Sequence, residues 1–217
     1  MVDLDLRLER RDLVAARLIA ALENAVADSA AGLRGSLASG AADGLSDIDV
    51  LWIVPDDSFG TALDVAEQAL GAVRPVSSLR IDPGLARSDR RRLLFVRFAD
   101  LPVFWRVDLD VRASSVGPDD RYDDDNAAAR SDVGWSRPSS AIENATAAVK
   151  AAVRHHDDTA TGLLSRGFAR IGRDHGPLSD LPRAITALAD LCAADDPRLA
   201  DRAAELHEIV DALLGEG

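Results

Sequence analysis

The chain has 217 residues, of which 47% are apolar, and it carries a formal net charge of −12 at pH 7. This length allows one large domain or two small ones, and the apolar share is high enough to exclude a globally disordered chain. The acidic balance argues against a protein that tracks nucleic-acid phosphates with a broad basic face.

The cysteine content and the apolar runs narrow the class further. Cys192 is the only cysteine, so an internal disulfide framework and a cysteine-based zinc site are excluded. No apolar run is long enough to span a bilayer, and the charged start MVDLDLRLERRDLV lacks the apolar core of a signal peptide. The sequence therefore predicts a soluble, cytoplasmic protein with no membrane partner.

The first half of the chain alternates between helical and strand patterns. The expected elements are an amphipathic helix within 5–29, a short strand and turn at GLRGSL, a strand at 47–54, a helix at 59–73, a strand at 74–81, and a hairpin of 93–98 and 102–111. This order predicts an α/β (α+β) fold, in which helices pack on a small mixed sheet.

The second half of the chain changes character. A polar stretch with Gly, Pro and an Asp run is expected to be a linker, and leucines and alanines then recur at helical spacing through 139–156, 158–172, 179–194 and 196–214. Short connections between these helices predict a small antiparallel bundle. We therefore expect a sheet domain over 1–112, a linker over 113–138 and a helical bundle over 139–217.

Two aspartates open the expected strand DIDVLWIV. Residues i and i+2 of a strand point to the same side, so Asp47 and Asp49 are expected to stand together. Adjacent carboxylates repel, and one is driven toward protonation unless a cation lies between them. Because oxygen ligands favour Mg²⁺, the pair predicts a magnesium site.

A third carboxylate follows in the expected strand 102–111. There, Phe104, Arg106, Asp108 and Asp110 would share one face. If this strand lies beside DIDVLWIV, Asp108 completes a cluster of three carboxylates. Such a cluster can hold two metal ions about 3.5–4 Å apart, the arrangement used for in-line phosphoryl displacement.

The Gly35–Ser36 pair precedes these strands and suits an anion. Glycine lets a backbone approach a phosphate closely, and serine offers a hydroxyl and an N–H. A helix that starts near Leu37 would aim its N-terminal amides at the same anion.

These motifs occur in a specific order along the chain. The dipeptide GS at 35–36, ten intervening residues, DID at 47–49 and the later VDL at 107–109 resemble the signature of the polymerase-β-like nucleotidyltransferase superfamily. The resemblance covers about residues 30–112, which is half of the chain. The helical second half is similar in layout to that of the aminoglycoside nucleotidyltransferases.

The resemblance implies a role for each matching residue. Gly35 and Ser36 would grip the triphosphate of a nucleotide. Asp47 and Asp49 would bind both metal ions, and Asp108 would hold the catalytic metal close to the acceptor hydroxyl. The implied cofactor is Mg²⁺.

Two residues of the helical half are further candidates. Lys150 is the only lysine, and related enzymes often place a lysine from this region on the triphosphate; the alternative is an exposed lysine on a helix. Glu143 is expected to begin the first bundle helix and could act as a base on the acceptor, as a glutamate there does in aminoglycoside enzymes. The alternative is a helix-terminal glutamate that suits the helix dipole.

Two residues of the strand 102–111 have open roles. Asp110 is either a fourth site carboxylate or a solvated residue at the end of the strand. Arg106 either orients Asp47 or Asp49 through a bidentate ion pair or balances the acidic cluster.

The sequence thus predicts a metal-dependent nucleotidyltransferase. It would move a nucleoside monophosphate from an NTP to a hydroxyl of a protein or of a small molecule such as an aminosugar, with release of pyrophosphate. An anionic cleft would attract a cationic acceptor, and no nucleic-acid substrate is expected. The alternative is a non-catalytic, antitoxin-like nucleotide-binding subunit that binds a helical partner protein. The acceptor, the preferred nucleotide and the oligomeric state stay open.

Overall fold

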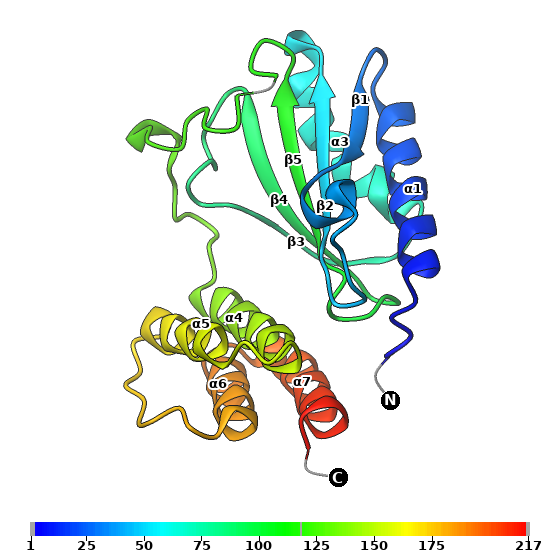
Figure 1. Ribbon diagram of the computed structural model, residues 1–217. Coiled ribbons are helices and arrows are strands. Elements are labelled where there is room, and N and C mark those ends of the chain that lie inside the picture. The colour runs from blue at the N-terminus through cyan, green and yellow to red at the C-terminus, as the bar shows by residue number, and fades with distance from the viewer. Residues whose placement is uncertain (1–2, 118, 216–217) are drawn as a thin grey trace. The chain divides into compact units, whose positions relative to one another are not determined.

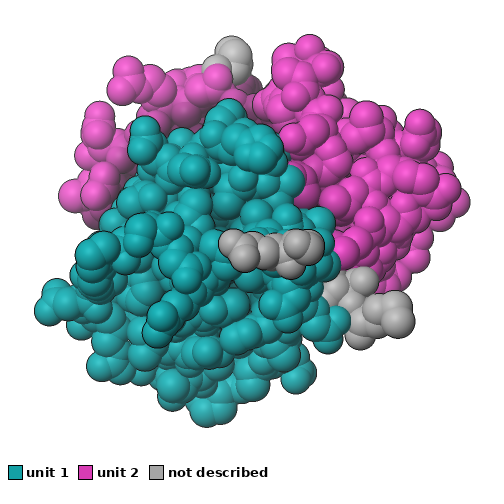
Figure 2. All heavy atoms as spheres, turned by 60° about the horizontal axis from the view of Figure 1, so that its bottom comes forward, with its two compact units in different colours: residues 1–2, 136–217 teal, residues 3–135 magenta. Residues whose placement is uncertain are grey.

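The computed structural model describes residues 3–117 and 119–215. Within them the chain forms two compact units, residues 3–135, drawn in magenta in Figure 2, and residues 136–215, drawn in teal. Residues 3–135, the first unit in chain order or sheet unit, contain a five-stranded mixed sheet with its own helices, and residues 136–215, the second or helical unit, are helical (Figure 1). The predicted fold class, a small mixed sheet followed by a helical bundle, is confirmed.

The sheet has the strand order β1-β2-β5-β4-β3. Its strands are β1 (Ala30–Leu33), β2 (Ile48–Val54), β5 (Val107–Ala113), β4 (Arg91–Phe98) and β3 (Val76–Ile81). The central strands β2 and β5 pair in parallel, and the other neighbouring strands are antiparallel. The parallel register sets Asp49 directly opposite Asp108.

Helices α1 (Leu8–Ala25) and α3 (Phe59–Gly71) pack on one face of the sheet (Figure 1). Alternate strand residues point to opposite faces, so the apolar set of each central strand lies on this covered face. Its buried members include Ile48, Val50, Trp52, Val54, Val107, Leu109 and Val111. Burial of these side chains is the main stabilising term of the unit. The intervening residues, which include Asp49 and Asp108, therefore point to the opposite face.

The connection between β4 and β5 differs from the predicted hairpin. The strand expected over 102–111 begins only at Val107. Val103, Phe104 and Trp105 are all buried, and the Trp105 amide donates to the carbonyl of Pro102 at 2.9 Å in a turn. Three consecutive buried side chains do not alternate between faces, so Phe104 does not share a strand face with Asp108 as the sequence predicted.

Most of the stretch 113–138, which the sequence assigned to a linker, packs with the sheet unit. The Arg87 amide donates to the Ala129 carbonyl at 2.8 Å, and the Ser131 amide donates to the Pro83 carbonyl at 2.9 Å. A short 3-10 turn, η2 (Ala127–Ala129), ends at the first of these contacts. Hydrogen bonds thus tie this polar segment to the region between β3 and β4.

The second unit contains α4 (Arg137–Val153), α5 (Asp157–Arg170), α6 (Leu181–Asp195), the 3-10 turn η3 (Pro197–Leu199) and α7 (Ala200–Leu213). The Ser136 hydroxyl accepts the Ser139 amide at 3.1 Å and caps α4, and the Asp180 carboxylate accepts the Arg183 amide at 3.1 Å and caps α6. Across the part of the chain that the structure describes, no helix has the length and apolarity that a bilayer crossing requires.

Candidate functional site

The candidate site lies on the polar face of the two central strands. Asp49 of β2 and Asp108 of β5 are direct partners in the parallel register. Asp47 lies one residue before β2, outside the ladder in which the sequence analysis placed it. Its negative charge nevertheless raises the pKa of the Asp49 carboxyl.

The backbone of Gly35 lies very close to the Asp49 side chain. The Arg34 amide donates to the Asp49 carbonyl at 2.9 Å, which carries the β1–β2 pairing up to the turn. Gly35 has a left-handed backbone (φ +57°), and a Cβ atom there would lie 2.3 Å from Asp49 Oδ2. A residue with a side chain would therefore be strained and would displace the carboxylate, so this turn requires glycine. Ser36 follows in the short helix α2 (Gly35–Ser39).

Arg106 lies directly before β5 and pairs with Asp108. Its Nε donates to Asp108 Oδ1 at 2.6 Å and its Nη2 donates to Oδ2 at 2.7 Å. The guanidinium also lies over the ring of Phe95, 4.8 Å from its centroid. The sequence analysis considered a bidentate pair with Asp47 or Asp49; the bidentate pair of the structure is with Asp108.

The electrostatics of Asp49 reflect this crowding. Burial raises the pKa of Asp49, and the like charges of Asp108 and Asp47 raise it further. The positive charges of Arg106 and Arg34 oppose this rise in pKa. The three carboxylates therefore repel one another in the way that favours a bound cation or a proton.

These residues fit a magnesium site in donor type, because carboxylate oxygens are the ligands that hard divalent cations prefer. They are not assembled as a finished site: within residues 3–117 and 119–215, no group of three or more His, Cys, Asp or Glu side chains is arranged to hold a metal ion. The partner of Asp108 is instead a guanidinium.

Asp110 is not the solvated strand end that the sequence analysis considered, because it is only 4% exposed. Its carboxylate accepts hydrogen bonds from Arg34 at 2.8 Å, from Arg91 at 3.2 and 3.3 Å, and from Arg112 at 2.6 and 3.1 Å. With its oxygens engaged by three guanidinium groups, Asp110 is the hub of a buried ion-pair network.

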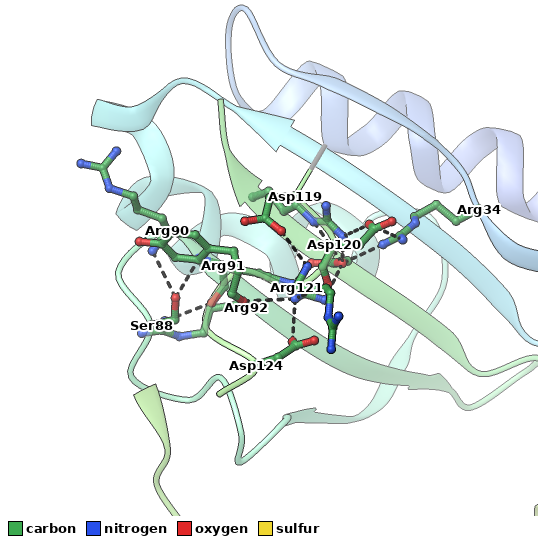
Figure 3. A network of polar contacts seen from close by, with 12 residues as sticks. Arg34, Ser88, Arg90, Arg91, Arg92, Asp119, Asp120, Arg121 and Asp124 are labelled. Carbon is green, nitrogen blue, oxygen red and sulfur yellow. Dashed lines mark hydrogen bonds and ion pairs between the residues drawn. The ribbon is translucent and has the colours of Figure 1, made fainter. Parts of the chain in front are cut away.

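The network extends to the segment after β5 (Figure 3). The Asp120 carboxylate accepts from Arg34 and from Arg112, each at 2.7 Å, and these arginines lower its pKa. Arg91 donates to the Asp120 carbonyl at 2.8 Å and to the Asp124 carboxylate at 2.9 Å. Arg34, which directly precedes Gly35, is therefore held from both sides.

Sequence reasoning missed this network. The sequence DLDVR places Asp110 and Arg112 on one face of a strand, which could have suggested an ion pair. Arg34 is 76 residues away from Asp110 along the chain, and no local pattern connects the two.

The remaining candidates belong to the second unit. Lys150 of α4 is only 8% exposed, so the alternative of an ordinary exposed lysine is wrong. Glu143 is the seventh residue of α4, which begins at Arg137. The alternative of a glutamate in the first helical turn is therefore wrong as well, since the dipole effect fades beyond that turn.

Comparisons with known proteins add little. No protein-family model matches the sequence, and no curated protein matches it at a significant level. Among solved structures, a chain of the GLD-2/RNP-8 complex is similar with a TM-score of 0.39 and 13% sequence identity, over 87% of this chain and 78% of that chain. A likeness at this level carries no argument about function, which rests on the site itself.

Proposed function

We propose that the chain is a metal-dependent nucleotidyltransferase that moves a nucleoside monophosphate from an NTP to a hydroxyl group of a small molecule or a protein. The observation that carries the proposal is the register of the central strands, which sets Asp49 opposite Asp108, with a glycine turn against Asp49. A paired set of carboxylates beside a close backbone approach is what a phosphate-bearing substrate with divalent cations requires.

In this reaction the acceptor oxygen attacks the α-phosphorus of the NTP. The bond from that phosphorus to the bridging oxygen of the β-phosphate breaks, pyrophosphate leaves, and the hydroxyl proton passes to a base. Bound Mg²⁺ would supply charge neutralisation on the phosphates and activation of the attacking oxygen. Asp47, Asp49 and Asp108 would be its ligands.

The other residues of the chain have supporting roles in this proposal. Gly35 and Ser36 would contact the triphosphate through the turn that Arg34 anchors. Lys150 would add a compact positive charge to the phosphates, and Glu143 is a candidate base for the acceptor. An acceptor that carries positive charge, such as an aminosugar, fits the net charge of −12.

A binding measurement tests the metal-dependent core of the proposal. Titration calorimetry with each of the four NTPs should give much tighter binding in Mg²⁺ than in EDTA. Asp49→Asn should abolish this difference, because it removes one ligand charge and keeps the side-chain shape. Asp64→Asn is the matched control, since Asp64 is exposed on α3 and outside the site. Equal affinity in Mg²⁺ and EDTA would overturn the proposal.

Turnover distinguishes the enzyme from a second candidate, a non-catalytic nucleotide-binding subunit with a helical partner. That candidate is favoured by the Arg106 guanidinium, which donates to both oxygens of Asp108, a metal ligand in the enzyme proposal. A pyrophosphate-release screen over the four NTPs and panels of cationic, neutral and protein acceptors should find turnover that Asp108→Asn removes. Tight Mg²⁺-dependent nucleotide binding without turnover on any acceptor would favour the binding subunit.

A further inference from the structure

Both oxygens of the Asp108 carboxylate are bound by one guanidinium group. Arg106 Nε contacts Oδ1 at 2.6 Å and Nη2 contacts Oδ2 at 2.7 Å, so the two groups face each other as matching forks. The side chains are 20% and 19% exposed, which keeps this pair partly shielded from water. Charge-assisted bidentate pairs of this type are short, directional and strong among hydrogen bonds.

The position of Arg106 is fixed by its surroundings. Its carbonyl accepts the Ile48 amide at 2.9 Å, which continues the β2–β5 pairing by one residue. Its guanidinium lies over the ring of Phe95, and Phe95 is the direct neighbour of Asp108 in the β4–β5 register. The backbone and the aromatic ring thus hold the fork at Asp108, which reduces the entropy lost in forming the pair.

We propose that Arg106 is the internal counter-cation of Asp108, and that a divalent cation binding at Asp49 and Asp108 has to take at least one carboxylate oxygen from it. The inference rests on the proposed function, because it concerns the metal ligands named there.

Two consequences follow from this exchange. Binding of a divalent cation alone is weak in the wild-type protein, because each binding event breaks a bidentate pair. In the absence of metal, Arg106 stabilises a strand pair that would otherwise oppose two like charges, Asp49 and Asp108, directly across the ladder. Arg106 is therefore a positioning residue that sets metal affinity.

The experiment measures binding of Mn²⁺ alone, without nucleotide, by electron paramagnetic resonance of the free ion. Arg106→Gln should bind Mn²⁺ roughly five- to tenfold more tightly than wild type, because the competing fork is gone. Arg106→Lys keeps the charge and loses the fork, and should bind about two- to fivefold more tightly. The matched control is Arg92→Gln, which removes the same charge. Arg92 lies on β4, and its guanidinium lies over the ring of Phe59. The affinity of this control variant should stay within about twofold of wild type.

Thermal melting gives a second readout that does not depend on activity. Metal-free Arg106→Gln should melt about 2–4 °C below wild type, since the carboxylates then lack their counter-cation. Saturating Mn²⁺ should raise the melting temperature of this variant more than that of wild type.

The outcomes separate the inference from the proposed function. Wild-type Mn²⁺ binding that Arg106→Gln leaves unchanged or weakens would overturn the inference alone, because Arg106 would then support the ligands. Tighter binding in Arg106→Gln with wild-type affinity in Arg106→Lys would also overturn it, since overall charge and not the fork would be responsible. Absence of Mn²⁺ binding in every variant, with or without nucleotide, would overturn both.

Discussion

The two units of the chain differ in what their interiors contain. In the sheet unit, Arg112 is fully buried and forms a network with buried Asp110 and Arg91. The interior of the helical unit is built mainly from alanine, leucine and isoleucine side chains, which include Leu164, Ile185, Leu188, Leu206 and Ile209, with Lys150 as a buried charged residue. Besides its apolar core, the sheet unit should therefore depend on the pairing of its buried charges, whereas the helical unit should depend mainly on the shapes of its side chains.

This difference matters because the two kinds of interior lose stability through different kinds of substitution. A buried ion pair contributes little net stability, since desolvation opposes the Coulomb attraction, but removal of one partner is strongly destabilising. An apolar interior responds instead to volume, through cavities or overpacking. The network of the sheet unit also holds Arg34 next to Gly35, so charge pairing there supports the candidate site directly.

The sequence provides a separate probe for each unit. The three tryptophans, Trp52, Trp105 and Trp135, lie in residues 3–135, so fluorescence reports on the sheet unit. The single cysteine, Cys192, is fully buried in α6 of the helical unit. Burial raises the pKa of the Cys192 thiol to about 12, so a thiol reagent should react with it only when the helical unit opens.

The largest expected effect is that of Asp110→Asn. This substitution removes the charge that faces Arg112, Arg91 and Arg34, and should lower the free energy of unfolding of the sheet unit by about 3–5 kcal/mol. Urea unfolding followed by tryptophan fluorescence measures this loss. The Cys192 labelling profile in urea should stay as in wild type, because the helical unit contains none of the network.

Asp100→Asn is the control for this prediction. Asp100 pairs with Arg74 at 2.9 Å, and their side chains are 40% and 35% exposed. Its removal should change the free energy of unfolding by less than about 1 kcal/mol, as is typical of surface ion pairs. An equal loss in both variants would mean that burial of the network does not matter, and a shift of the Cys192 profile in Asp110→Asn would mean that the units unfold together.

The second prediction concerns the shape dependence of the helical unit. Gly167 of α5 lies against α6, and a Cβ atom there would be 2.5 Å from Leu188 Cδ2 and 3.3 Å from Asn144 Cβ. Gly167→Ala should therefore destabilise the helical unit by about 1–3 kcal/mol through overpacking. The Cys192 labelling midpoint in urea should fall, with the tryptophan profile unchanged.

The same helix offers a matched control. Gly162 of α5 has nothing within 4 Å of a Cβ position, so Gly162→Ala should stabilise the helix by about 0.5–1 kcal/mol. If Gly167→Ala were as stable as Gly162→Ala, the contact with Leu188 would be loose and the helical unit would not depend on shape in the way described.

The third prediction tests a glycine whose role differs from that of Gly167. Gly35→Ala introduces a side chain at a left-handed position, which should cost about 1–2 kcal/mol, and it pushes a Cβ atom into the Asp49 carboxylate. We expect a modest loss of stability together with loss of Mg²⁺-dependent nucleotide binding, measured by calorimetry. Gly40→Ala is the control, because Gly40 has φ +72° with nothing within 4 Å. Equal nucleotide affinity in the two variants would show that Gly35 is not part of the nucleotide site.

Part of this picture follows from the sequence because local periodicity determines it. The alternation in DIDVLWIV and VDLDV identifies two strands and the polar face of each. If the two strands are neighbours, Asp49 and Asp108 then share one face of the sheet. Helical spacing likewise locates the helices of the second half to within a few residues.

The remainder depends on contacts that periodicity does not encode. Alternation predicts which face Asp110 occupies, but not its ion pair with Arg34, which comes from a distant segment and is itself paired with Asp120. The polar composition of the segment 113–138 suggested a linker, although its carboxylates and carbonyls are the partners of buried arginines. Burial of Lys150 depends equally on tertiary packing, which overrides the expectation for a polar residue on a helix.

The smallest expected effect is a pH dependence confined to the sheet unit. Hydrogen bonds from the side chain and backbone of Ser115 lower the pKa of Asp56, and those from Ser114 and Arg90 lower it further. A carboxyl whose pKa is lower in the folded state than its unfolded value of about 3.9 stabilises the fold above that value. This contribution is lost as the pH falls through the folded pKa.

Asp56→Asn should therefore melt slightly below wild type from pH 7 to about pH 5, and the difference should shrink as the pH falls below about 4. Melting curves followed by tryptophan fluorescence measure the difference in the sheet unit. Asp57→Asn is the control, because Asp57 is the exposed neighbour of Asp56 and changes the same charge. A difference between wild type and Asp56→Asn that stayed constant down to pH 2 would show that the effect is not linked to ionisation. The acid sensitivity of the sheet unit would then arise from its other carboxylates, such as Asp120, whose pKa the arginines of the network also lower.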